Sequence, residues 1–221
     1  MTCAGPAGEP MGIFRSGERP PDWCELRAFS IERPARGAEL RHARRQPRER
    51  ILVTRGRCAL RWPDGATVLR AGQFLDPLAD AWTVAGLTDD AELLRLSGRW
   101  GEEIAGCGIW SLRNEEGATH TGHPVDYPKR TRLDPHYHDY DEYWILLDGA
   151  ATVVVSGRPA RATAGDCVPI GMGHHHDMPE VEGIMRGAFF ETTLEGRKRL
   201  GHLWNHTHGP AEPRPERVWR P

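Results

Sequence analysis

Short apolar runs separated by turn residues restrict the fold of this chain more than any other feature. Each run is only three to five residues long, and dipeptides such as Asp64-Gly65, Asp148-Gly149 and Ser156-Gly157 follow several of them. Only residues 194–203 have the pattern of a short helix. The sequence therefore predicts an all-β sandwich or barrel. The clearest runs lie at residues 51–54, 67–69, 93–96, 144–147, 152–155 and 186–190.

An internal repeat divides the chain into two similar halves. Three residues recur 93 positions later without a gap, Glu49 as Glu142, Gly56 as Gly149 and Gly72 as Gly165. The segments between them match in type, each with a strand, a turn, a strand and a second turn. The repeat predicts two tandem β-barrels that divide near residues 97–106. We expect a loose arm over 1–22, barrels over 23–100 and 101–194, and a C-terminal helix or tail over 195–221.

Composition and charge exclude several classes of function. The 221 residues hold 29 Lys and Arg against 31 Asp and Glu, a net charge of −2, which gives no field for nucleic acid or an anionic membrane. The sequence lacks a long apolar run, a signal peptide and the glycine-rich loops of nucleotide-binding proteins. Five scattered cysteines without a C-x-x-C pair indicate reduced thiols. We expect a soluble, cytoplasmic protein that acts on a small molecule.

Histidine is concentrated in the second half of the chain, where ten of the eleven histidines follow residue 119. His136 and His138 share one face of an extended strand, and Glu142 follows after a short bend. A second group, 174–176, stands in a turn before a later strand. Three imidazoles and one carboxylate suit Fe(II), Mn(II), Ni(II), Cu(II) or Zn(II), and they leave coordination positions open for substrate or dioxygen.

This pattern resembles the cupin superfamily. Its first motif reads Gly-x5-His-x-His-x3,4-Glu-x6-Gly, and His136, His138, Glu142 and Gly149 match it, with Arg130 in place of the leading Gly. Its second motif is matched by Gly165, Gly173 and His176, with Gly171 in place of a Pro and Glu180 in place of an Asn. The resemblance implies a jelly-roll barrel in which His136, His138, Glu142 and His176 bind one divalent metal.

The repeat extends this resemblance to the first half. The four ligand positions correspond there to Ala43, Arg45, Glu49 and Thr83, and only the glutamate remains. The chain therefore resembles a bicupin whose N-terminal barrel has lost its metal. We expect the N-terminal barrel to supply packing area or the surface of a homodimer.

Further residues are candidates for catalysis or substrate contact. Glu191 and Tyr127 are candidate acid–base groups, the alternative for Glu191 being a charge at a strand end. Arg130 and Arg132 are candidates for binding an anionic substrate, the alternative being arginines on a solvent-facing surface. Trp144 shares the face of Glu142 and is either a wall beside the metal or a core residue.

Three assignments near the motifs stay open. We expect His174 and His175 to be exposed, and Asp177 either to orient His176 or to cap a turn. The histidines of residues 202–208 form a second site, a lid or a surface tail, and the sequence favours the tail.

The resemblance favours an enzyme. We expect Fe(II)-dependent, dioxygenase-type chemistry on a small polar metabolite. The alternatives are a redox-neutral isomerase, lyase or decarboxylase, and a cupin that binds a small ligand without catalysis.

Overall fold

The computed structural model describes residues 12–194, 196 and 198–218. Within this part of the chain almost all regular structure is β-strand, and all six predicted apolar runs lie in strands. The strands are β1 (Phe14–Arg15), β2 (Leu26–Glu32), β3 (Glu39–Ala43), β4 (Arg48–Arg55), β5 (Arg57–Trp62), β6 (Gly65–Arg70), β7 (Phe74–Leu75), β8 (Ala81–Gly86), β9 (Glu92–Gly98), β10 (Ile104–Arg113), β11 (Glu142–Val155), β12 (Arg158–Thr163), β13 (Asp166–Ile170) and β14 (His176–Thr193). A short helix α1 (Asn205–His208) and a 3-10 turn η1 (Pro215–Arg217) follow.

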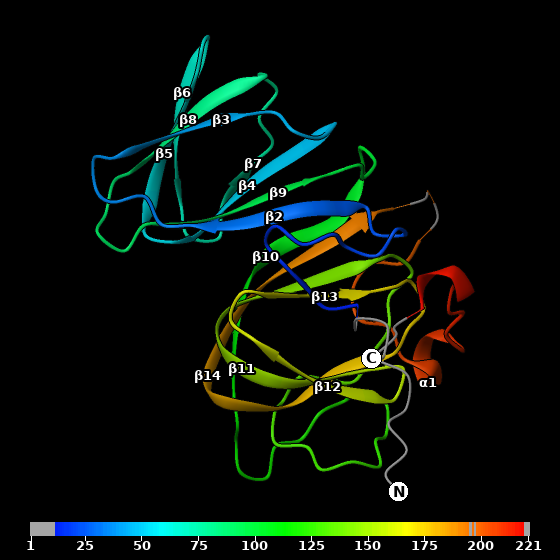
Figure 1. Cartoon of the computed structure of the whole chain (residues 1–221). Helices are drawn as coiled ribbons and strands as arrows, with labels where there is room; N and C mark the ends of the chain where they lie inside the picture. Colours follow the sequence, from blue (N-terminus) through cyan, green and yellow to red (C-terminus); the bar gives the residue numbers. More distant parts are fainter. Residues whose placement is uncertain (1–11, 195, 197, 219–221) are drawn as a thin grey trace, which may run out of the picture.

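The C-terminal half is built around two long antiparallel strands, β11 and β14 (Figure 1). Its sheet has the order β1-β13-β11-β14-β10, and β12 pairs with the far part of β11. Irregular pairing between Leu146 and Ala150 bends β11 at Asp148-Gly149. The bend curls the sheet around a core that includes Trp144, Val168 and Met178. This half is the C-terminal barrel.

Residues 26–98 form the N-terminal barrel from two four-stranded sheets, β2-β9-β4-β7 and β3-β8-β5-β6. Their inner faces enclose a separate core that includes Ile51, Leu60 and Trp82. In β4, Ile51 and Val53 face this core and Leu52 faces the other side, because successive side chains of a strand point to opposite faces.

Strand pairing in the two barrels agrees with the 93-residue repeat. The partners Ile51 and Leu75 correspond to the partners Trp144 and Val168. Cys58 and Leu69 likewise correspond to Ala151 and Ala162. The repeated glycines also adopt the same backbone conformation, with φ of 59° and 84° at Gly56 and Gly72, and 78° and 93° at Gly149 and Gly165. A side chain rarely adopts these positive angles, so both halves keep glycine at the same turns.

A third apolar cluster lies between the two barrels and is shared by them. Leu94 and Leu96 of β9 pack in the same cluster as Ile145 of β11 and Phe190 of β14. Figure 1 shows the β2 and β9 strands of the upper barrel lying over the sheet of the lower one. Arg186 joins the barrels at the edge of this core, since it donates to Asp148 and, at 2.9 Å, to the carbonyl oxygen of Thr54. The barrels are therefore joined face to face by a buried interface.

Three predictions about the chain ends differ from the structure. Residues 12–22 are not a loose arm, because Phe14 is buried and β1 pairs with β13; residues 1–11 lie outside the described part. No helix occurs among the described residues of 194–203, and the short α1 follows them. The segment 199–218 is not a free tail, because Leu203 is buried and pairs with Tyr137. Residues 195, 197 and 219–221 lie outside the described part.

Candidate metal centre

Four predicted ligands meet at one end of the C-terminal barrel. His136 and His138 lie on the segment before β11, Glu142 is the first residue of β11, and His176 is the first residue of β14. One donor atom from each lies within 4.8 Å of the others, and all four residues are buried. Nε2 of His136 is 3.1 Å from Nε2 of His138, and Oε2 of Glu142 is 3.3 Å and 3.1 Å from Nε2 of His138 and of His176. The predicted set therefore forms one compact cluster.

Backbone carbonyls fix the tautomer of each imidazole in the cluster. Nδ1 of His136 lies 2.6 Å from the carbonyl oxygen of Asp134, Nδ1 of His138 lies 2.9 Å from that of Gly201, and Nδ1 of His176 lies 2.9 Å from that of His174. A carbonyl only accepts, so each Nδ1 carries the proton and donates. Each Nε2 of a neutral ring then keeps a lone pair directed at the cluster. Metal-binding histidines are commonly held in this way.

The donor atoms fit a cation. Burial and the neighbouring histidines lower the pKa of His136 well below its ordinary value, so that ring is neutral. Oε2 of Glu142 and Nε2 of His176 are buried and have no hydrogen-bond partner among the described residues. Two nitrogen lone pairs that face each other at 3.1 Å repel unless a cation lies between them. Two donors at right angles, each about 2.1 Å from one ion, are about 3.0 Å apart. The residues present therefore fit a divalent metal.

Trp144 holds the ligand carboxylate in place. Its indole Nε1 donates to Oε1 of Glu142 at 2.7 Å, which leaves Oε2 directed at the histidines. The indole is also buried in the core and packs edge-on against His176, with ring centroids 5.2 Å apart. The structure thus places Trp144 as a core residue that orients the Glu142 carboxylate.

Glu191 lies beside the cluster, so it is more than a charge at the end of a strand. It pairs with Glu142 across β14 and β11, and its carboxylate is 4.0 Å from Nε2 of His138. Burial and the charge of Glu142 raise the pKa of Glu191 to about 8, although His202 opposes the shift. Gly106 of β10 makes room for it, since a Cβ there would lie 2.5 Å from a Glu191 carboxylate oxygen.

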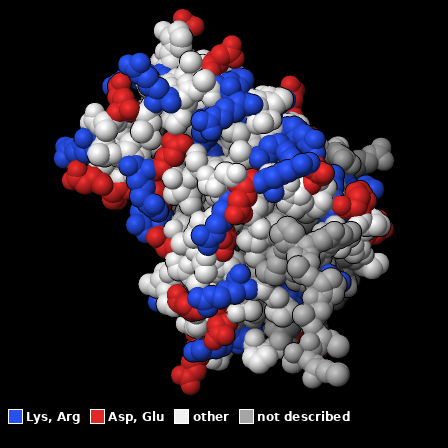
Figure 2. Space-filling view, viewed as in Figure 1, with Lys and Arg blue, Asp and Glu red and all other residues white. Residues whose placement is uncertain are grey.

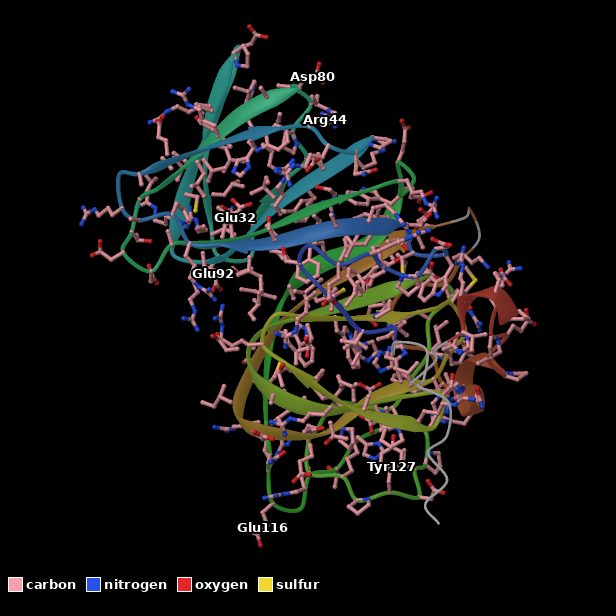
Figure 3. All side chains as sticks on the ribbon, viewed as in Figure 1. Glu32, Arg44, Asp80, Glu92, Glu116 and Tyr127 are labelled. Carbon is pink, nitrogen blue, oxygen red and sulfur yellow. The ribbon has the colours of Figure 1, made fainter. Side chains whose placement is uncertain are left out.

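Tyr127 lies near the cluster without touching it. Its hydroxyl donates to Asp177 at 2.9 Å, and Lys129 Nζ lies 2.5 Å from the same carboxylate. The Asp177 carboxylate is therefore not the partner that orients His176, and its role goes beyond capping a turn. It is buried at the centre of the polar group that it forms with Tyr127 and Lys129. Tyr127 stands on the loop below the C-terminal barrel (Figure 3), where residues 123–127 line one side of a hollow of about 170 Å³ that reaches His176.

The prediction that Arg130 and Arg132 contact the substrate is wrong. Arg130 is exposed and pairs with Glu180 at 3.1 Å, and Arg132 is exposed and pairs with Glu115 at 2.5 Å. The alternation of strand faces could not place them, because residues 114–135 form no regular strand among the elements of the chain. Their guanidinium groups belong to the solvent-facing surface.

The histidines that the sequence placed at the surface are partly buried. His174 is buried, and its Nδ1 is 2.6 Å from the hydroxyl of Ser156. His175 is half-buried and stacks on His123 with ring centroids 3.9 Å apart. Both sit below the C-terminal segment, where Arg214 donates its backbone N–H to Met172 at 3.2 Å. The favoured exposed position is therefore wrong for both residues.

His202 is the functional candidate that the sequence did not assign. Its ring stacks on His136 at 3.6 Å between centroids, and its Nδ1 is 2.8 Å and 3.0 Å from the two oxygens of Asp134. Trp204 Nε1 donates to the same carboxylate at 2.8 Å. The only feature of the sequence that pointed to His202 was the cluster of histidines over 202–208. A surface tail accounted for that cluster equally well.

Asp134, His136 and His202 do not form a second metal site. Their potential donor atoms lie within 4.8 Å of one another, but the rings of His136 and His202 are parallel within 4° at 3.6 Å. A nitrogen lone pair lies in the plane of its ring, so two stacked rings cannot direct lone pairs at one ion. Asp134 and His202 instead support His136 from outside the first cluster.

The corresponding end of the N-terminal barrel holds an arginine. Glu49, the counterpart of Glu142, accepts from Arg95 Nε at 2.9 Å, from Arg95 Nη2 at 3.0 Å and from Ser97 Oγ at 2.7 Å. Both partners are buried, so the guanidinium neutralises the carboxylate that a metal would otherwise neutralise. No metal-binding group was found among the described residues of this barrel.

Comparisons with known proteins agree with the fold and the site. The family model described as the cupin domain matches residues 123–186, which include all four cluster residues. The solved structure of a mutant of Bacillus subtilis oxalate decarboxylase is similar, with a TM-score of 0.55 at 11% identity over 89% of this chain and 80% of that chain. The oxalate decarboxylase of Lactobacillus farciminis in a formate complex has a TM-score of 0.53 at 11% identity, covering 86% and 88%.

One curated relative covers nearly the whole chain. The uncharacterized protein y4oW of Sinorhizobium fredii is 50% identical over 210 residues, which is 94% of this chain and 97% of that protein. Within the described part, the structure contains no helix that is both long and apolar enough to cross a bilayer. The chain therefore contains a cupin domain at residues 123–186, and it belongs to the same family as y4oW.

Proposed function

We propose that this protein is a metal-dependent enzyme that carries out a redox-neutral reaction on a small polar metabolite, with Glu191 as the group that transfers a proton. The position of the Glu191 carboxylate carries the proposal. It lies 4.0 Å from Nε2 of His138 and directly across the sheet from Glu142. Isomerases, lyases and decarboxylases all require a proton to move next to the reacting group.

The chain supplies the remaining parts of such a site. His136, His138, Glu142 and His176 would hold the ion, and the metal would polarise an oxygen of the substrate as a Lewis acid. Bacillus subtilis oxalate decarboxylase, which shares the fold, has Mn(II) centres, and this supports a divalent metal here. The apolar core that includes Trp144 and Met178 lies beside the donors and limits the access of water.

Fe(II)-dependent dioxygenase chemistry is the second candidate. The donor set favours it, because three imidazoles and one carboxylate leave two or three positions of an octahedral ion for substrate and dioxygen. Glu191 would then line the site and form hydrogen bonds there. It would not transfer a proton in the rate-limiting step.

Turnover without dioxygen separates the two candidates. The protein is purified anaerobically, loaded with Fe(II), Mn(II) or Co(II), and incubated with a panel of small hydroxy acids, keto acids and sugars while products are followed by NMR. We expect product without dioxygen, and Glu191→Gln to lower kcat by about 100-fold with unchanged metal content. Glu182→Gln, an exposed position on the same strand, is the matched control. Product that forms only as dioxygen is consumed would overturn the proposal in favour of the dioxygenase.

A further inference from the structure

Strand β10 forms one edge of the C-terminal sheet. It stands last in the order β1-β13-β11-β14-β10, and β14 is its one strand neighbour within the described chain. The opposite edge differs, because β1 covers β13 there. The backbone hydrogen bonds that the described residues make outside regular strands include none from residues 104–113. The N–H and C=O groups on the outer side of β10 therefore lack a backbone partner in this part of the chain.

This edge has few of the features that keep an edge strand from pairing with another strand. It is ten residues long, and its register with β14 is unbroken from Gly106 to Arg113, so no bulge twists it away. Charged side chains are scattered over the face shown in Figure 2, whereas β10 carries none between Ile104 and Leu112. The residues from Ile104 to Trp110 are all partly exposed. A long, uncharged and accessible edge is a template for a further strand.

The two ends of β10 carry opposite charges. Glu103 directly precedes the strand and is exposed, and Arg113 ends the strand with 72% of its side chain exposed. Arg113 lies 3.7 Å from Glu115, a long ion pair at the surface. Two copies of β10 aligned in parallel would bring Arg113 next to Arg113. Antiparallel alignment brings Arg113 next to Glu103 at both ends, so the charges favour a second copy of the same strand as the partner.

We propose that two copies of this protein associate through β10, with the strands antiparallel and Gly108 opposite Gly108 on the twofold axis. Side chains that face each other across a sheet lie on the same side of it, so a symmetric strand pair is centred on a residue and not between two residues. Centring on Gly108 places Arg113 opposite Glu103 of the second copy. Centring on Ile109 would instead place Glu103 opposite Glu115, which are like charges.

The side chains of the two copies match in this register. Trp110 lies opposite Gly106 of the second copy, so a large ring covers a position that has no side chain. Ile104 lies opposite Leu112, and both are apolar. The outer backbone groups of each β10 bond to the other copy, and the sheet continues from one protein molecule into the next.

Reversal of the charges at the ends of β10 tests this proposal. Sedimentation equilibrium gives the dissociation constant of the dimer for the full chain, Glu103→Arg, Arg113→Glu and the double variant. Each single reversal places like charges at both ends of the contact, so it should weaken dimerisation at least about tenfold. The double variant restores both opposite pairs and should dimerise within about threefold of the unmodified protein. Arg70→Glu reverses an exposed arginine of β6 and serves as the matched control.

Amide hydrogen exchange locates the contact. It is followed by NMR below and above the dissociation constant, and the amides of 104–113 that do not bond to β14 should exchange more slowly above it. Protection that does not depend on protein concentration would mean that a segment of the same chain pairs with β10, and would overturn the proposal.

Three results of the sedimentation experiment would also overturn the proposal. They are a protein that stays monomeric at about 1 mM, a dimer that neither single reversal weakens, and a double variant as weak as the single variants. None of these outcomes bears on metal binding or turnover, so the proposed function is tested separately.

Discussion

Each histidine of the cluster combines a donated proton on one side with a free lone pair on the other. His136, His138 and His176 all direct Nδ1 at a backbone carbonyl and Nε2 at Glu142 or at one another. These hydrogen bonds fix the direction of each Nε2, so loss of one ring removes a directed nitrogen donor.

Replacement of one cluster histidine should abolish metal binding. We expect His136→Ala or His176→Ala to lower affinity for Co(II) or Mn(II) by more than about 100-fold, because each removes a directed nitrogen. Elemental analysis after dialysis and the visible spectrum of the Co(II) protein measure the effect. His206→Ala, an exposed histidine whose ring neighbours are His123 and Trp204, is the control. Unchanged metal content in the His176→Ala protein would contradict the assignment.

The lowered pKa of Glu49 predicts that the stability of the N-terminal barrel depends on pH. Burial alone would raise its pKa, but hydrogen bonds from Arg95, Arg45 and Ser97 outweigh burial and lower the pKa below the ordinary 4.5. A lowered folded pKa means that ionised Glu49 stabilises the fold above pH 4.5, and that this stability is lost as the pH falls through the folded pKa.

Glu49→Gln should remove that pH dependence and leave Arg95 buried without its anion. We expect the variant to lose about 3 kcal/mol of unfolding free energy at pH 7, and the difference from the unmodified protein to shrink as the pH falls below 4.5. Urea denaturation at several pH values measures it. A difference that stays constant from pH 7 to pH 3 would refute the pairing as its source.

The segment after β14 completes the metal site from outside the barrel. Gly201 supplies the carbonyl for His138, His202 stacks on His136, and Leu203 pairs with Tyr137. We expect Leu203→Ala to cost about 3 kcal/mol of stability, because it empties a buried position, and to weaken metal binding about tenfold by loosening Gly201. Denaturation and Co(II) titration test both effects. Leu200→Ala changes a residue that is 62% exposed and serves as the control, so it should change neither the stability nor the affinity for Co(II).

The sequence identified what depends on local pattern and spacing. Strands could be predicted because short apolar runs end at turn residues such as Gly149. The candidate ligands could be predicted because the spacing of His136, His138 and Glu142 is itself local, although the two histidines lie on an irregular segment and not on a strand. Arg130 could not be placed, because its segment lacks a regular strand that would define a face. His202 and Phe14 reach the site and the core only through tertiary contacts with distant strands, which no local pattern encodes.

The shared core makes the two barrels one folding unit. Leu94 and Leu96 face Ile145 and Phe190 across the interface, so neither barrel keeps its apolar surface covered without the other. The N-terminal barrel, which lacks the metal ligands, is thus part of the support of the metal centre.

Leu96→Ala in the N-terminal barrel should therefore affect both halves. We expect a loss of about 3 kcal/mol and one cooperative transition in which tryptophan fluorescence and Co(II) release change together. Differential scanning calorimetry and the Co(II) spectrum on heating measure this. Leu78→Ala, at a position 94% exposed, is the control. Two separate transitions, with metal release unaffected by Leu96→Ala, would show that the barrels unfold independently.

The carbonyl of Gly201 has a consequence for how the holoprotein is made in the cell. All fourteen strands of the described residues precede Gly201, so a ribosome has synthesised both barrels before His138 receives the carbonyl that fixes its tautomer. A nascent chain that stops at β14 carries the four donors with one of them free to rotate. We therefore expect full metal affinity only after the C-terminal segment has been translated and has docked against the barrel.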